Sequence, residues 1–85
     1  MFVVYVLVNE RGDRTYVGQT EDLEERLRVH NLGYVRSTER FGPWRVLHQE
    51  SVGSRGEAMK RETYYKSAVG RRHIAKMLME RCPSG

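Results

Sequence analysis

The sequence predicts one α+β domain, a three-stranded antiparallel sheet flanked by helices in the order β-β-α-β-α-α. Two apolar runs within the first 18 residues enclose a short polar turn, which is typical of a β-hairpin. Helix-capping signals at Thr20 and Ser54 each precede a stretch expected to be helical, and a further apolar run at 44–52 lies between them. A chain of 85 residues suffices for one compact domain, so we assign residues 1–82 to it and 83–85 to a frayed tail.

The hairpin is expected to consist of strands over residues 2–8 and 14–18. The first strand is a continuous Val-rich run, which indicates that it is covered on both faces of the sheet. The second ends at Gly18, where the backbone must pass close to another group. If the turn takes four residues, Tyr5 lies opposite Tyr16 and both phenols point to the same face.

The first helix is expected to begin after Gln19, with Thr20 as its N-cap. The acids at 21–25 favour the positive end of the helix dipole, and Gly33 provides a left-handed stop. Because helix formation accounts for this acidic run, we assign it no chemistry. A basic loop over residues 34–43 follows.

The second half of the chain predicts one strand and two helices. The strand covers residues 44–52, and the helix that Ser54 opens is expected to end at Gly70. The last helix covers residues 71–81. Its apolar face consists of Ile74, Met77 and Leu78.

The net charge of +4 is unevenly distributed along the chain. Residues 1–33 carry four Arg against six acids, whereas residues 34–85 carry eleven Lys and Arg against five acids. Arg outnumbers Lys twelve to three, which favours recognition of phosphate or carboxylate groups. The second part is therefore the candidate phosphate-facing surface, and a solvated face that aids solubility is the alternative.

Composition also indicates the compartment. No apolar run approaches the roughly 20 residues of a membrane-spanning helix, so no membrane association is expected. The N-terminus has no basic segment before its apolar run, which favours a strand over a signal peptide. A lone Cys82 has no partner for an internal disulfide, as expected in a reducing cytoplasm.

Two polar side chains interrupt the apolar stripe of the first helix. The stripe consists of Leu23 and Leu27; at about 100° per residue His30 projects close to Leu23, and Arg26 lies roughly 60° to the side. A buried His often serves structure alone, for example by donating to a backbone carbonyl. The pair nevertheless lies one turn apart, as residues that serve one site would.

Glu62 is the sharpest anomaly, because it projects within about 40° of the narrow stripe expected to face the core of the second helix. That stripe consists of Ala58, Tyr65 and Val69. Buried acids are rarely left unpaired, so a structural ion pair with Arg26 is one explanation. We favour a functional site, since residues from separate elements can converge in one cleft.

The pattern Tyr-Val-Gly-x-Thr-x-Asp-Leu-x-x-Arg-x-x-x-His-Asn over residues 16–31, preceded by Val-Tyr-Val at 4–6 and followed by Glu62, resembles the GIY-YIG nuclease superfamily. The resemblance covers Phe2 to about Lys66 and is strongest to small stand-alone members and to structure-specific resolvase-type nucleases. The N-terminal nuclease module of the ABC excinuclease is a more distant match, which carries a Lys where this chain has Gln19. The implied fold is the GIY-YIG endonuclease fold, a three-stranded antiparallel sheet with flanking helices.

The resemblance implies hydrolysis of DNA phosphodiester bonds with one divalent metal ion, Mg²⁺ or Mn²⁺, bound by Glu62. Tyr16 is the candidate general base and Tyr5 an assisting hydrogen-bonding group. Arg26 would hold the scissile phosphate, and His30 would orient the phosphate or accept a proton. Which of Tyr5, Tyr16 and His30 is the general base stays open.

The expected substrate is DNA, branched or damaged DNA included, in repair or processing. No small-molecule organic cofactor is expected, and a protein partner for targeting is possible. Phosphate contacts are expected from four basic residues, Arg36, Arg40, Arg45 and Lys66. Such contacts carry no sequence information, which favours a structure-selective or weakly sequence-specific endonuclease.

The alternatives are a catalytically weak nucleic-acid-binding module that keeps the nuclease fold and a structural domain. Trp44 is expected in the core rather than stacked on a base.

Overall fold

The computed structural model describes residues 1–36, 38 and 40–81 and has the predicted order of elements. These elements are β1 Phe2–Asn9, β2 Thr15–Thr20, α1 Leu23–Asn31, β3 Trp44–Val52, α2 Arg55–Lys66 and α3 Ala68–Arg81. Cys82 and the predicted tail lie outside the described residues. In the described part of the chain, no helix has the length and apolar character needed to cross a membrane.

The sheet has the order β2-β1-β3, and β1 pairs antiparallel with both neighbours. Tyr5 pairs with Gly18, and Tyr16 pairs with Leu7. The prediction that Tyr5 lies opposite Tyr16 assumed a turn at residues 9–12 and was wrong by two residues, because β1 continues to Asn9 and the connection covers residues 10–14. Both phenols still point to one face, since residues two apart along a strand share a face.

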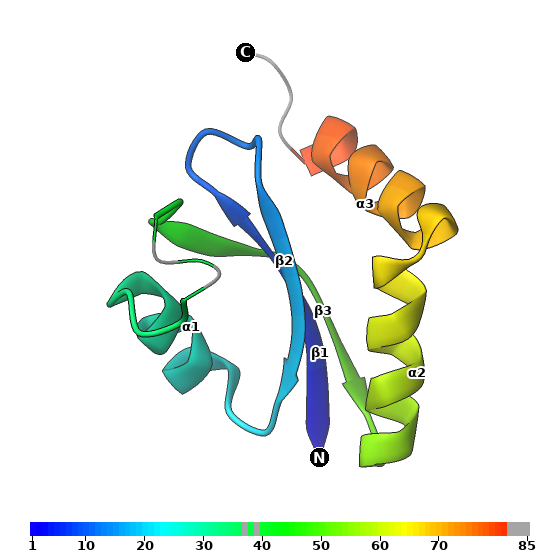
Figure 1. Cartoon of the computed structure of the whole chain (residues 1–85). Coiled ribbons are helices and arrows are strands. Elements are labelled where there is room, and N and C mark those ends of the chain that lie inside the picture. Colours follow the sequence, from blue (N-terminus) through cyan, green and yellow to red (C-terminus); the bar gives the residue numbers. More distant parts are fainter. Residues whose placement is uncertain (37, 39, 82–85) are drawn as a thin grey trace.

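Helices cover both faces of this sheet: α1 lies on one side, and α2 and α3 lie on the other (Figure 1). Alternate residues of β1 consequently enter different clusters. Val4, Val6 and Val8 pack under α2 and α3, whereas Tyr5 and Leu7 belong to the cluster on the α1 side. Burial on both faces explains why β1 is a continuous apolar run rather than an alternating one.

Two helix boundaries differ from the sequence-based expectation. Asp22, not Thr20, is the N-cap of α1: its carboxylate accepts from the backbone N–H of Glu25 at 3.2 Å. The Thr20 hydroxyl instead accepts from the N–H of Asp22 at 3.1 Å, one residue before the helix proper.

The second correction concerns the junction of α2 and α3. Helix α2 ends at Lys66 with Ser67 as its C-cap, and Gly70 lies inside α3. A side chain at position 70 would overlap the backbone carbonyl of Tyr64, so this glycine permits close approach of the two helices. Val69, predicted on the buried stripe, is 53% exposed because the chain turns before it.

Candidate active site

Tyr5 lies at the centre of the α1-side cluster and is 1% exposed. Its hydroxyl lies 3.2 Å from Nε2 of His30 and accepts from Nε of Arg26 at 3.3 Å. Burial raises the pKa of Tyr5, and the neighbouring Arg26 only partly offsets this rise. The phenol therefore keeps its proton near neutral pH and acts as a hydrogen-bonding group.

His30 is 1% exposed and uses both ring nitrogens. Its Nδ1 lies 2.9 Å from the hydroxyl of Thr38, and that hydroxyl donates to the carbonyl of Val35 at 3.2 Å. Since the hydroxyl has one proton and has given it away, Nδ1 of His30 must donate and Nε2 must accept from Tyr5. Burial lowers the pKa of His30, and the nearby Arg26 lowers it further, so the ring is neutral.

These contacts form one directed chain of hydrogen bonds. Arg26 donates to Tyr5, Tyr5 to His30, and His30 to Thr38. The chain holds the guanidinium of Arg26 through its Nε atom, and the terminal nitrogens carry the remaining N–H donors. No ion pair joins Arg26 to any acid among the residues the structure describes. Arg26 is therefore a preoriented cation that can take an anionic ligand.

Tyr16 stands beside this chain on the edge strand β2. Its ring lies 6.3 Å from the ring of Tyr5 in a stacked arrangement and 4.7 Å from the ring of His30. The hydrogen bond to Tyr5 raises the pKa of Arg26, and Tyr16 adds to this rise, which places Tyr16 next to the guanidinium as well. Because Tyr16 is half-buried and its proton enters no described hydrogen bond, it is the phenol that can exchange a proton with a ligand.

Glu62 approaches from α2, on the other side of the sheet. One carboxylate oxygen accepts from Nε2 of Gln19 at 3.2 Å, and the other accepts from Nζ of Lys66 at 2.6 Å. Gln19 follows Gly18, which lies against the Tyr5 hydroxyl, so the hydrogen bond from Gln19 holds the carboxylate at the same edge strand as the phenol. Glu62 forms no ion pair with Arg26, which removes the structural explanation offered for this acid.

The side chain of Glu62 is 23% exposed, so it lies at the margin of the core rather than inside it. No group of three or more His, Cys, Asp and Glu gathers anywhere in the described part of the chain. A single accessible carboxylate fits an ion such as Mg²⁺, which keeps most of its water ligands. Glu62 is therefore the residue that could hold such an ion.

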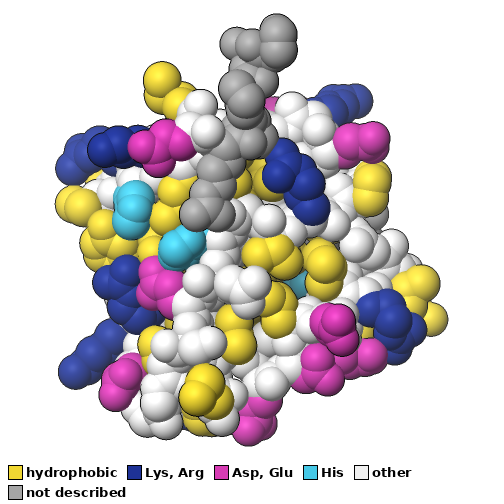
Figure 2. All heavy atoms as spheres, turned by 180° about the vertical axis from the view of Figure 1, so that it is seen from behind, with side chains coloured by type: hydrophobic (Ala, Val, Ile, Leu, Met, Phe, Trp, Pro, Cys, Tyr) yellow, Lys and Arg dark blue, Asp and Glu magenta, His cyan; other side chains and the backbone are white. Residues whose placement is uncertain are grey.

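The four predicted phosphate contacts lie at different places. Arg36 and Arg40 are exposed in the connection between α1 and β3, and Arg45 is exposed near the start of β3. Lys66 is bound to Glu62. From behind, Figure 2 shows acidic and basic side chains interspersed over the surface. The excess positive charge of the second part of the chain is not concentrated on that face.

Sequence reasoning missed several residues that build the site. Gln19 holds Glu62, and Thr38 fixes the tautomer of His30. Asn31 ties the end of α1 to β3, because its side chain accepts from the backbone N–H of Trp44 at 2.5 Å and donates to its carbonyl at 3.1 Å. Trp44 is 5% exposed and packs in the core, as predicted. A polar residue in a motif or loop gives no sign of its partner in the sequence.

Similarity to known proteins covers most of the chain. The profile of a family described as the GIY-YIG catalytic domain matches residues 1–75. A UPF0213 protein of Staphylococcus haemolyticus is 34% identical over 79 residues, which covers 92% of this chain and 94% of that protein. A UPF0213 protein of Streptococcus agalactiae is 38% identical over 64 residues, or 73% of each chain.

Two further relatives extend the comparison. A structure-specific endonuclease subunit SLX1 homolog from Giardia intestinalis is 33% identical over 81 residues. The match covers 87% of this chain but 23% of that protein, so the chain spans about a quarter of its length. The solution NMR structure of the UPF0213 protein BH0048 from Bacillus halodurans has a TM-score of 0.52 and 28% identity, covering 91% of this chain and 85% of that one.

Proposed function

The chain belongs to the GIY-YIG family, and from this premise we propose that it is a metal-dependent DNA endonuclease. The activity proposed is hydrolysis of phosphodiester bonds in DNA, selective for structure or only weakly for sequence, in repair or processing. The name of the Giardia relative, a structure-specific endonuclease subunit, supports this choice of substrate.

One observation carries the proposal. Arg26 on α1 donates to the buried Tyr5, and Tyr16 on β2 stacks beside its ring. Glu62 on α2 accepts from Gln19, which follows the Gly18 that lies against the Tyr5 hydroxyl. A cation, a phenol with an uncommitted proton and a carboxylate are the groups that hydrolysis of a phosphodiester requires. A purely structural domain does not need these three groups close together for its stability.

Arg26 would hold the scissile phosphate with its terminal nitrogens and stabilise the charge that develops there. Tyr5 and His30 would keep the guanidinium in place through the hydrogen-bond chain. Tyr16 would orient the attacking water or accept its proton. Since the pKa of a free phenol lies near 10, the second role requires the positive charge of Arg26 close by.

Glu62 would hold one Mg²⁺ or Mn²⁺, with Gln19 fixing the orientation of its carboxylate. When bound, such an ion would neutralise charge on the phosphate and lower the pKa of water. Lys66 now neutralises the same carboxylate and would be displaced by the ion, which frees its ammonium for the DNA backbone. Arg36, Arg40 and Arg45 are the remaining candidates for backbone contacts.

The test is cleavage of branched, flapped and linear DNA in the presence of Mg²⁺ or Mn²⁺ and then with chelator. Glu62→Gln and Arg26→Ala are expected to lose at least about 100-fold in rate, as removal of one transition-state donor typically does. Glu57→Gln is the matched control, an exposed acid in the first turn of the same helix. Cleavage by Glu62→Gln at the wild-type rate would reject the metal assignment.

The close contact of Lys66 with Glu62 also favours a second candidate, a nucleic-acid-binding module with weak catalysis, because a neutralised carboxylate resists binding a metal ion. Tight, salt-sensitive DNA binding without cleavage in either metal would select this alternative.

A further inference from the structure

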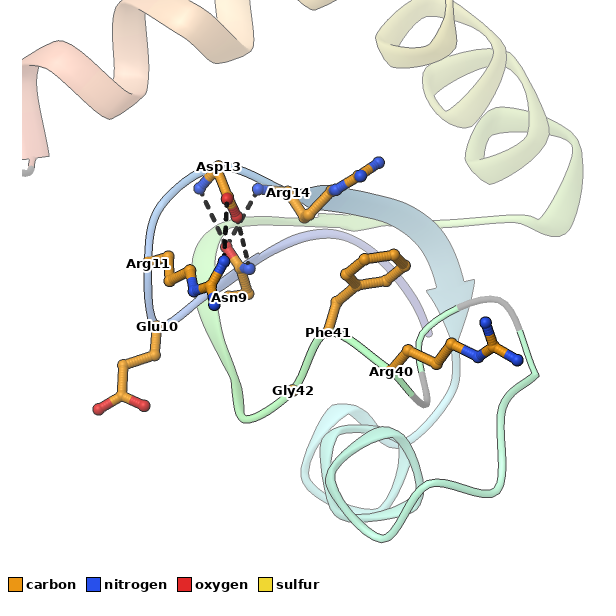
Figure 3. A pocket seen from close by; sticks show the side chains of 8 residues that line it. All are labelled: Asn9, Glu10, Arg11, Asp13, Arg14, Arg40, Phe41 and Gly42. Carbon is orange, nitrogen blue, oxygen red and sulfur yellow. Dashed lines mark hydrogen bonds and ion pairs between the residues drawn. The ribbon is translucent and has the colours of Figure 1, made fainter.

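A hollow of about 290 Å³ lies beside the β1–β2 turn. The turn forms one side of it and residues 40–42 form the other (Figure 3). Its lining combines charges of both signs with one aromatic ring. The residues are Asn9, Glu10, Arg11, Asp13, Arg14, Arg40, Phe41 and Gly42.

The turn side of the hollow is held by Asn9, which is 4% exposed. Its side-chain oxygen accepts from the backbone N–H groups of Asp13 at 3.1 Å and Arg14 at 3.0 Å. Its side-chain nitrogen donates to the carboxylate of Asp13 at 2.8 Å. Gly12 supplies the positive φ of 77° that the turn needs. The wall of the hollow is therefore formed before any ligand arrives.

The guanidinium of Arg14 lies over the ring of Phe41 at 4.4 Å from its centroid. Phe41 in turn packs against the cluster that contains Tyr5 and Tyr16. This contact holds the planar guanidinium against a packed ring, and because Arg14 is exposed a nucleobase can stack on its other side. In Figure 3 the side chain of Arg40 starts beside Phe41, in the connection between α1 and β3, and extends away from the β1–β2 turn.

Charge divides the hollow into two parts. Arg14 and Arg40 form no ion pair with any described residue, whereas Glu10 and Asp13 lie toward the turn. Arg14 and Arg40 attract a phosphate, whereas on the turn side Arg11 lies 4.0 Å from the carboxylate of Asp13 and offsets its charge, which leaves Glu10 to repel one. The carboxylates can instead accept hydrogen bonds from the amino groups of a base. A nucleotide therefore fits with its phosphate toward Arg40 and its base toward the turn.

The hollow continues the candidate active site along β2. Arg14 directly precedes β2, and its guanidinium lies over Phe41, which packs against the same cluster as Tyr16. Two residues of a strand span about 6.7 Å, so Arg14 lies about one nucleotide from the site of Tyr16. A DNA strand whose scissile phosphate is bound by Arg26 would extend over Arg14.

We propose that this hollow binds an unpaired nucleotide next to the scissile phosphate, with its base stacked on Arg14 and its phosphate bound by Arg40. A base inside a duplex has both faces covered by its neighbours, so only a splayed or single-stranded flank can enter. The hollow thus selects DNA with an unpaired strand beside the cut. This inference rests on the proposed nuclease function for its position in the substrate but predicts a binding property of its own.

The first measurement is binding without cleavage. A short single-stranded oligonucleotide with one 2-aminopurine is titrated with the protein in chelator, and quenching of the fluorescent base reports stacking. The variants are Phe41→Leu, which keeps an apolar side chain for the core, and Arg14→Gln, which changes an exposed residue. Arg72→Gln, exposed on α3, removes the same charge on the opposite side of the sheet.

We expect both hollow variants to bind the single strand about 5-fold to 100-fold more weakly and to lose the quenching, as removal of a stacking group does. Arg72→Gln should bind as the wild type does. Full-strength quenched binding by Arg14→Gln, or binding of a fully paired duplex of the same sequence as tight as that of the single strand, would overturn the proposal.

The second measurement separates this proposal from the nuclease assignment. Cleavage of a flapped substrate is compared with cleavage of a blunt duplex, using wild type and Arg14→Gln. A flap preference that disappears in Arg14→Gln supports the proposal, whereas active cleavage with an unchanged preference rejects the hollow and retains the nuclease. Quenching that depends on Arg14, without cleavage of any substrate, supports the hollow and rejects the nuclease.

Discussion

The phenol of Tyr5 lies across the backbone of Gly18, so close that a Cβ atom at position 18 would stand 2.5 Å from its oxygen. The two residues are also directly paired between β1 and β2. The missing side chain leaves room on the edge strand for the hydroxyl to contact Arg26. The glycine and the tyrosine of the motif therefore work as one unit.

Gly18→Ala is expected to displace the Tyr5 ring, because the new methyl group would also stand 2.7 Å from its Cζ atom and 3.1 Å from Tyr16. Both rings lie in a packed cluster, where overpacking costs about 1–3 kcal/mol of unfolding free energy. The hydrogen bond from Arg26 would lengthen, and DNA cleavage should fall by more than the fraction of unfolded protein explains. Denaturant unfolding and cleavage rates measure the two effects.

Gly53→Ala is the control, since nothing lies within 4 Å of a Cβ atom at that position. Its unfolding free energy should change by less than about 0.5 kcal/mol. Equal behaviour of the two alanine variants would show that Gly18 does not make room for the phenol.

The sequence predicted the sheet and the order of the helices from the positions of the apolar runs. It also identified polar residues near the β2 edge, because apolar periodicity reveals a polar residue that interrupts a core-facing stripe. Arg26 and His30 could be identified in this way because the first helix has few apolar residues, so the face that must be buried is defined by Leu23 and Leu27. It did not predict Thr38, since contact between residues eight apart in a loop depends on the path of the chain. Gly70 was predicted to end a helix but lies where two helices pack closely. Glycine is typical of both situations, so the sequence does not distinguish them.

Stability should fall in mild acid because of His30. Burial and the charge of Arg26 lower the pKa of this ring below its ordinary value of 6.5. As pH falls below 6.5, the unfolded chain binds a proton that the folded protein resists, so stability is complete above this value and decreases below it. For one such proton the slope cannot exceed about 1.4 kcal/mol per pH unit. Urea unfolding between pH 7.5 and 5 (about neutral to mildly acid) measures it.

The control compares slopes rather than absolute stabilities, because His30→Gln also breaks hydrogen bonds. That variant should have a smaller slope than the wild type in this range. His73→Gln is the comparison, since it replaces an exposed histidine of α3 that lies outside this chain of hydrogen bonds. An identical slope in all three proteins would mean that His30 titrates equally in the folded and unfolded states.

Glu50 on β3 anchors α2 through a polar network separate from the proposed catalytic residues. It accepts from Arg61 at 2.8 Å and 3.1 Å, from the hydroxyl of Tyr65, and lies 2.9 Å from Nε2 of His48. Arg61, followed by Tyr65 and His48, lowers the pKa of Glu50 from 4.5 to about 2, despite the opposing effect of burial. The stabilisation is thus fully present above pH 4.5 and is lost as pH falls toward 2.

Glu50→Gln should therefore lower the unfolding free energy near neutral pH by about 2 kcal/mol, the scale of hydrogen bonds to a charged group. Its stability should also depend less on pH between 4.5 and 2 than that of the wild type. Circular dichroism during acid and urea titrations measures both. Glu57→Gln serves as the comparison, and a loss as large in that exposed variant would contradict the network's role.

The contact of Lys66 with Glu62 predicts competition between an ammonium and a metal ion for one carboxylate. The Nζ atom lies 2.6 Å from the oxygen, so binding of Mg²⁺ to that oxygen must displace it. Lys66→Met should then reduce the Mg²⁺ concentration that gives half-maximal cleavage, while DNA binding weakens by the loss of one phosphate contact. Lys60→Met, exposed on the same helix, loses the same charge without a contact to Glu62 and should keep the wild-type metal requirement.

A higher Mg²⁺ requirement in Lys66→Met would mean that the lysine assists metal binding instead of opposing it. Salt dependence of DNA binding distinguishes the two contributions, since only the phosphate contact changes its slope.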